Sequence, residues 1–246
     1  MTPVVQTALP LSALAALVGG AFAWVVISRW QATKRAAFLA WGAGLTMFAL
    51  GALFQALGEI KGFAWGPGDI VFRGFYLFGG VLGVIILALG TVHLMAPKKV
   101  AKITTWAVVA LSIAVGIDSL LVPVDESKLI YVQGVLGGAL ASHANLLYFG
   151  VVFFNIVGSL ILIVGSAWSA WKFIRTRQAI DRVICNVLLT TGAFVVATGF
   201  SLAKTSGLGL QVLGGVELIG IGVMFAGFLA LGRIKVPATT RVAATH

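Results

Sequence analysis

A glutamate lies deep inside an apolar run near the end of the chain. Glu217 follows the start of the run 208–232 by about nine residues, which at about 1.5 Å of rise per residue places it roughly 13 Å into a helix. A carboxyl group is stable in apolar surroundings only when it is protonated, paired with a cation or open to water. The position therefore predicts either an ion pair between helices or a site that binds a polar ligand.

Other polar residues occur near the ends of apolar runs, and helical spacing groups several of them. Gln55 and Glu59 are four residues apart, and Arg73 and Tyr76 are three apart, so each pair shares one face of a helix. The candidate ligand-binding or ion-pair residues are Glu217, Arg73, Tyr76, Asp118, Glu59, Lys204 and Gln55.

We interpret these residues as a polar pocket around Glu217, in which Arg73 or Lys204 supplies the counter-charge. Ionisable side chains inside apolar spans are costly and mark functional sites by default. The alternative interpretation is an ion pair between helices that, with ordinary hydrogen bonds, stabilises the bundle.

Several activities are excluded by missing residues. The run 208–232 has no lysine that could form a Schiff base with retinal, and the chain has no zinc-protease, Cys-x-x-Cys or phosphate-loop motif. Paired haem ligands are also missing, because His93 and His143 are expected on opposite sides of the membrane. We therefore expect no enzyme, no catalytic residue, no metal site and no cofactor.

The elements that position these residues follow from composition. Of the 246 residues 60% are hydrophobic and only 10% are charged, with a mean hydropathy of +1.07. A soluble domain carries about 25% charged residues, so the polar surface of a soluble globule is missing here. The composition predicts a polytopic helical membrane protein.

Seven apolar runs are long enough to cross a bilayer, which needs about 20 residues per helix. They cover residues 6–28, 36–58, 71–95, 103–124, 146–171, 183–203 and 208–232. No linker separates two parts of the chain. The expected fold is all-α: residues 1–246 form a single domain, a bundle of seven transmembrane helices.

The distribution of basic residues predicts orientation. With the first loop in the cytoplasm, 13 of the 17 basic residues lie on that side and four lie on the other. The 13 are Arg29, Lys34, Arg35, Lys98, Lys99, Lys102, Lys172, Arg175, Arg177, Arg182, Arg233, Lys235 and Arg241. The N-terminus is therefore expected outside and the C-terminus in the cytoplasm, and the basic excess indicates lipid, not nucleic acid, as the partner.

The one long loop, 125–145, is expected on the outer side and is apolar from Leu129 to Ala141. We interpret it as an interfacial or hairpin segment that lies over the bundle. The alternatives are a lid on an outward cavity, or a surface that docks a partner protein, a role that a glycine-rich helix face could also have. Gly44, Gly51 and Gly58 form such a face on one predicted helix, where they predict close helix packing.

The block 38–91 resembles uncharacterised seven-helix membrane proteins of prokaryotes. The resemblance depends on Trp41, Gly44, Gly51, Glu59, Phe72, Arg73, Tyr76, Leu77, Gly79, Gly80, Leu89, Gly90 and Thr91. It implies a prokaryotic plasma-membrane protein and brings no known activity.

Three functions stay open. The first is binding or transport of a small solute through a polar pocket in the outer half of the bundle. The second is a non-catalytic accessory or scaffold subunit of a larger membrane complex. The third is a membrane sensor that acts through a partner, because the tail after Gly232 is only 14 residues long.

Overall fold

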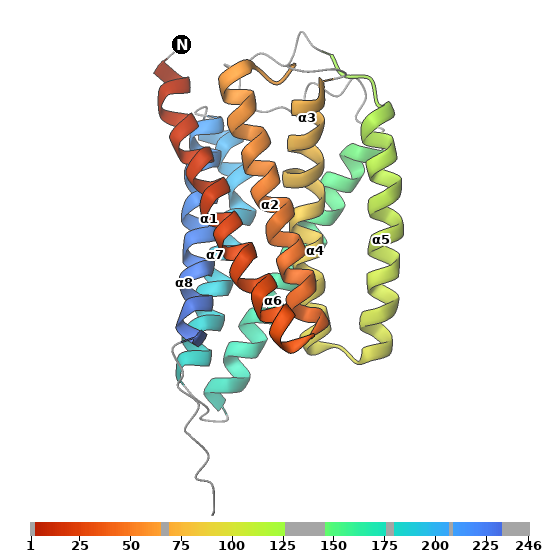
Figure 1. Ribbon diagram of the computed structural model, residues 1–246, viewed down its shortest axis with the longest axis vertical. Coiled ribbons are helices and arrows are strands. Elements are labelled where there is room, and N and C mark those ends of the chain that lie inside the picture. Colours follow the sequence, from red (N-terminus) through yellow and green to blue (C-terminus); the bar gives the residue numbers. More distant parts are fainter. Residues whose placement is uncertain (1–2, 65–68, 126–145, 176–179, 207–208, 233–246) are drawn as a thin grey trace, which may run out of the picture.

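The computed structural model describes residues 3–64, 69–125, 146–175, 180–206 and 209–232, and these form a bundle of long helices (Figure 1). In chain order the elements are α1 (Pro3–Thr33), α2 (Ala36–Lys61), α3 (Ile70–Gly74), the π-helix η2 (Phe75–Leu82), α4 (Gly83–Met95), α5 (Lys98–Leu121), α6 (Leu146–Arg175), α7 (Ile180–Ser206) and α8 (Leu210–Gly232).

The helices have the length and composition of membrane spans. Within the described residues, 6 helical segments are long and apolar enough to cross a bilayer, and α7 adds a shorter apolar stretch, Val183–Gly199. One of the 6 is the continuous segment Ile70–Met95, which joins α3, η2 and α4. The predicted all-α membrane bundle is confirmed at this level.

The helix bounds differ from the predicted runs where charged residues continue a helix. α1 extends past Arg29 to Thr33, and α5 begins at Lys98, five residues before the predicted run. Basic side chains at a helix end reach the aqueous interface, so they do not need to interrupt the backbone. Apolar runs therefore locate spans but underestimate helix length.

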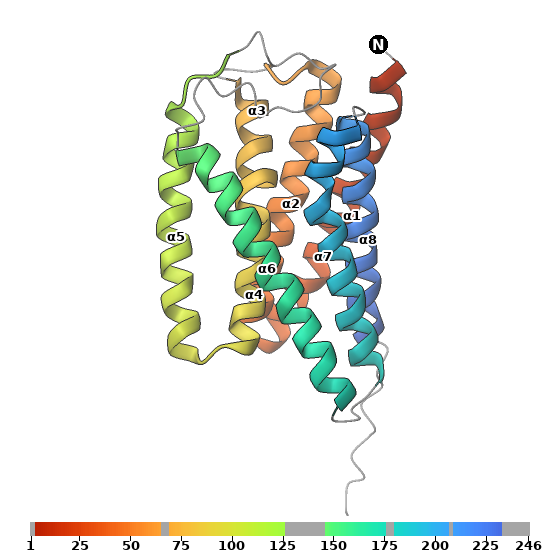
Figure 2. The same cartoon turned by 180° about the vertical axis from the view of Figure 1, so that it is seen from behind.

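Six helical rods form a closed ring: α1, α2, the continuous rod of α3, η2 and α4, α6, α7 and α8. α1 packs against α2 and α8, α8 against α7, α7 against α6, α6 against α4, and α4 against α2. α5 lies outside this ring at one edge, next to α4 and α6 (Figure 2). Its buried residues are Ala101, Val108, Val115 and Ser119, and most of its large apolar side chains point outward.

Two glycines of α2 allow helix backbones to approach closely, as the sequence predicts. A Cβ atom on Gly44 would lie 2.4 Å from the Leu87 nitrogen of α4, and one on Gly51 would lie 2.5 Å from the Gly79 Cα of η2. Small residues at such crossings permit tight packing in lipid. These contacts hold α2 against the rod that α3, η2 and α4 form.

The rod that α3, η2 and α4 form contains a π-helical stretch, η2, that could not be predicted from its sequence. Within η2, the carbonyl oxygen of Gly80 accepts a hydrogen bond from the Nδ2 atom of Asn155 on α6. The same Asn155 group donates to the Val151 carbonyl at 2.8 Å. π-helical turns leave backbone groups without their regular partners, and here a side chain of the neighbouring helix supplies one.

Candidate functional site

The site begins with two polar residues on the last turns of α2. Gln55 and Glu59 are 0% and 2% exposed, so both side chains lie inside the bundle. The Nε2 group of Gln55 donates a hydrogen bond to Glu59 Oε1 at 3.0 Å, which realises the predicted four-residue spacing. Their shared face points into the protein and away from lipid.

Ser12 of α1 completes the contacts of Glu59. It is fully buried, and its hydroxyl group donates to Glu59 Oε2. The same oxygen also lies 3.2 Å from the Leu9 carbonyl and 3.3 Å from the Ala8 carbonyl. A hydroxyl group has one proton, so Ser12 can donate either to Glu59 or to its own helix.

Glu217 approaches the same place from α8. The Oε2 atom of Glu217 is buried and has no hydrogen-bond partner among the described residues, and the Glu59 carboxyl is close enough to act on it electrostatically. Three residues earlier, a Cβ atom on Gly214 would lie 3.3 Å from the Ser12 nitrogen and 3.5 Å from Gln55 Nε2. The glycine thus lets α8 contact both polar neighbours. We refer to Ser12, Gln55, Glu59 and Glu217 as the acid-pair cluster.

The acid-pair cluster has an excess of negative charge. In the described part of the chain, the groups that act on the two acids are Ser12, Gln55 and the acids themselves, none of which is a cation. Two carboxyl groups close together and out of water cannot both be ionised without a positive charge. Among the described residues the pair therefore has no compensating cation, and one bound proton would remove the repulsion.

Of the two counter-charges expected from the sequence, Arg73 and Lys204, only Arg73 has a described side chain. The Nη1 group of Arg73 donates to the Ser119 carbonyl in the last turn of α5, where a cation is favoured by the helix dipole. The side chain of Lys204 lies outside the described residues. The structure brings Glu217 near enough to Glu59, a second acid, for the two to interact electrostatically, because α1 packs against both α2 and α8.

The remaining candidates have structural contacts. Asp118 Oδ2 accepts a hydrogen bond of 2.7 Å from the Leu147 backbone nitrogen, so it satisfies a free donor in the first turn of α6. Tyr76 is 4% exposed and packs against Phe72 and Phe75 in the apolar core. Neither residue belongs to the acid-pair cluster.

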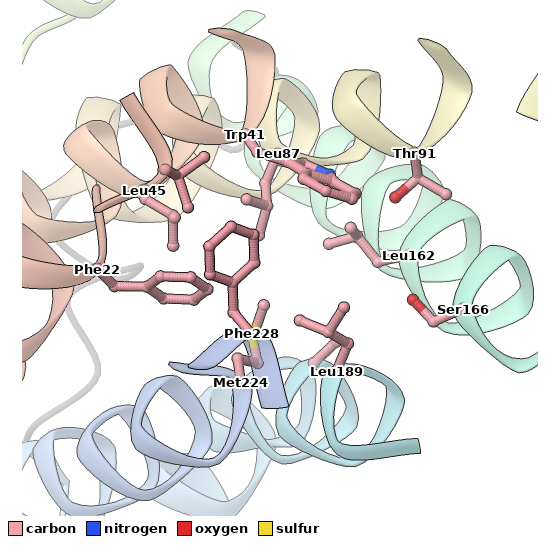
Figure 3. Close-up of a pocket in the computed structure, with 12 residues that line it drawn as sticks. Phe22, Trp41, Leu45, Leu87, Thr91, Leu162, Ser166, Leu189, Met224 and Phe228 are labelled. Carbon is pink, nitrogen blue, oxygen red and sulfur yellow. The ribbon is translucent and has the colours of Figure 1, made fainter. Parts of the chain in front are cut away.

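Two small cavities lie inside the ring, displaced from the acids toward the C-terminal end of α8. Each has a volume of about 30 Å³. The cavity nearer to Glu217 along α8, which we call the upper cavity, is lined by Ile221 and Met224 among others. The cavity further from Glu217, the lower cavity, is lined by Met224 and Phe228 among others and is shown in Figure 3. With Glu217 these residues follow spacings of four, three and four, so all four lie along one face of α8. The face leads from the acid-pair cluster past both cavities.

Aromatic side chains surround the lower cavity. Phe22 stacks on Phe225 with ring centres 4.9 Å apart and lies 5.5 Å from Phe228. The guanidinium of Arg29 lies over the Phe228 ring at 5.7 Å. Phe22 and Phe228 thus line the cavity as part of an aromatic cluster that Arg29 contacts.

Sequence reasoning found three of the four members of the cluster and missed Ser12. A serine in an apolar helix is common and usually bonds to its own helix, so nothing in the residue type distinguishes it. The apolar segment from Leu129 to Ala141 lies outside the described residues.

No family model, curated protein or solved structure matches the chain. The resemblance to seven-helix prokaryotic proteins therefore stays a prediction.

Proposed function

We propose that this membrane protein binds a proton at the acid pair Glu59–Glu217 and moves it across the bilayer. The observation that supports the proposal is the buried Oε2 atom of Glu217, which lacks a hydrogen-bond partner among the described residues and belongs to a side chain on which the Glu59 carboxyl acts electrostatically. A proton neutralises one of the two acids, so the pair carries a single negative charge and the repulsion between two carboxylates is removed. Chains of carboxyl groups inside membrane proteins commonly relay protons.

The contacts of Glu59 favour a proton over a metal cation. Both of its oxygens already accept hydrogen bonds, one from Ser12 and one from Gln55, so donor hydrogens point at the carboxyl group. Hard cations are bound by several oxygen atoms whose lone pairs are free to coordinate. A proton needs only one such atom, and Glu217 Oε2 provides it.

Cavity size favours a proton over an organic solute. The cavities along α8 measure about 30 Å³ each. A single water molecule requires about 10–15 Å³ on this measure. These two cavities therefore accommodate species of the size of water.

Ser12 suits a site whose protonation changes. When Glu59 is ionised, the serine hydroxyl donates a hydrogen bond to it. When Glu59 carries the proton, the serine oxygen can accept a hydrogen bond from the carboxyl O–H and donate its own to the Leu9 carbonyl. Each state keeps its hydrogen bonds satisfied, so gain and loss of the proton leave no donor unpaired. We also propose the orientation with the N-terminus outside, which places the pair in the outer half.

Proton flux into sealed vesicles tests the proposal. Purified protein is reconstituted into lipid vesicles that contain a pH-sensitive dye, and a potassium diffusion potential, negative inside, is applied with valinomycin. We expect internal acidification in wild-type vesicles, and at least a tenfold lower initial rate for Glu217→Gln, because glutamine cannot bind and release a proton at this place.

The matched control is Asp118→Asn, which removes an acid that lies outside the cluster. It is expected to retain the wild-type rate. Equal rates in wild-type, Glu217→Gln and protein-free vesicles would contradict proton transport, and flux that requires external sodium would assign the pair to a metal cation. The accessory-subunit and sensor functions remain predictions from the sequence.

A further inference from the structure

Two buried hydroxyl groups inside the ring lack the partner that such groups usually have. The hydroxyls of Thr46, Thr105 and Thr190 each donate to the carbonyl four residues earlier at 2.8 Å. Thr91 of α4 and Ser166 of α6 are 6% and 9% exposed, and within the described residues neither has a hydrogen bond. A buried hydroxyl without a partner is costly unless a ligand or water satisfies it.

Both hydroxyl groups face the lower cavity. Figure 3 shows the Thr91 and Ser166 oxygens turned toward the space beside Leu162, on the side of the cavity away from Phe22. Trp41 also lines this cavity and provides the one side-chain N–H donor among its lining residues. The remaining lining is apolar, so the polar groups gather at one wall.

The cavity has the size of one or two water molecules. Its volume is about 30 Å³, and a water molecule needs about 10–15 Å³ together with two to four polar partners. The two hydroxyl groups supply the two partners that are the minimum for a water molecule. A purely apolar cavity of this size would stay dry. The two hydroxyl groups are therefore the feature that allows water to bind in this cavity.

We infer that the cavity between Thr91 and Ser166 binds water. This water would accept and release a proton that moves between the acid pair and the basic end of the bundle. The second part rests on the proposed function. In the transfer, a water oxygen accepts one proton and the same molecule releases another, so one positive charge moves and no other bond changes. Met224 borders both cavities and lies about two turns from Glu217 along α8.

Radiolytic hydroxyl-radical labelling tests the water site without requiring transport. Radicals form from water at the place where it is held, and Met224, 5% exposed, lies against the cavity and is oxidised readily to the sulfoxide. We expect millisecond labelling of Met224 in the wild-type protein and at least a fivefold lower rate in the double variant Thr91→Val with Ser166→Ala.

Two controls keep the result interpretable. Met95, 45% exposed, should be labelled equally in both proteins, and Thr91→Ser, which keeps a hydroxyl group, should retain the labelling of Met224. A wild-type Met224 rate at background, or an unchanged rate in a folded double variant, would overturn the water site. Labelling as expected without proton flux would uphold the water site and contradict only the proposed function.

Discussion

Replacing Glu217 by lysine is expected to leave the protein folded and to stop proton movement completely. The ammonium group would lie beside Glu59 and supply permanently the positive charge that a proton supplies in the wild-type pair. The acid pair would then become an ion pair that cannot release its charge. The measurement is thermal unfolding in detergent together with proton flux in vesicles.

Ile221→Lys provides the matched control one turn further along α8. Ile221 is 2% exposed and lines the upper cavity, where the described lining has no acid. A lysine near the middle of a membrane helix costs about 3 kcal/mol when it has no partner, so this variant should unfold at a clearly lower temperature than Glu217→Lys. Equal destabilisation by the two lysines would contradict an unneutralised acid pair.

Alanine at Gly44 or Gly51 is expected to destabilise the bundle strongly. The added Cβ atoms would lie 2.4 Å and 2.5 Å from backbone atoms of α4 and η2, which cannot rotate away as a side chain could. Such overpacking typically costs about 1–3 kcal/mol, and here it separates α2 from the rod that completes the ring. Unfolding midpoints in mixed detergent measure the loss.

Gly116→Ala and Gly222→Ala are the controls for the glycine variants. Nothing lies within 4 Å of a Cβ atom at either position. Alanine is the better helix former by up to about 1 kcal/mol, so these variants should be as stable as the wild-type protein or more stable. Loss of stability at all four positions would show that close packing of α2 is not the cause.

The chain's apolar runs were sufficient to predict the membrane bundle, because each span needs a length of apolar residues that few other structures use. The π-helical stretch at Phe75–Leu82 was not predictable, since Gly79 and Gly80 are compatible with a regular helix as well. Its partner, Asn155, comes from α6, and spacing within one run contains no information about contacts between runs.

The candidate site was predicted in part for the same reason. Glu217 stands out in the sequence because it lies deep inside the apolar run 208–232. The four-residue spacing of Gln55 and Glu59 correctly predicted that both lie on one face of α2. Charge complementarity favoured Arg73 or Lys204 as the partner of Glu217. Arg73 donates to the Ser119 carbonyl, and the Lys204 side chain lies outside the described residues, so the choice of counter-charge stays a prediction. The neighbours of α8 in the ring are α1 and α7, and α2 reaches it at the height of Gly214, so a second acid faces Glu217.

Infrared spectroscopy of the carboxyl groups tests most directly whether the acid pair holds a proton. A protonated carboxyl group has a carbonyl band that an ionised one lacks, and the band shifts when deuterium replaces the proton. The account predicts such a band in wild-type protein at neutral pH, and a change in its frequency or intensity in both Glu59→Gln and Glu217→Gln, because each variant removes one member of the pair. Absence of the band in the wild-type protein, or its persistence unchanged in both variants, would contradict a proton shared by Glu59 and Glu217.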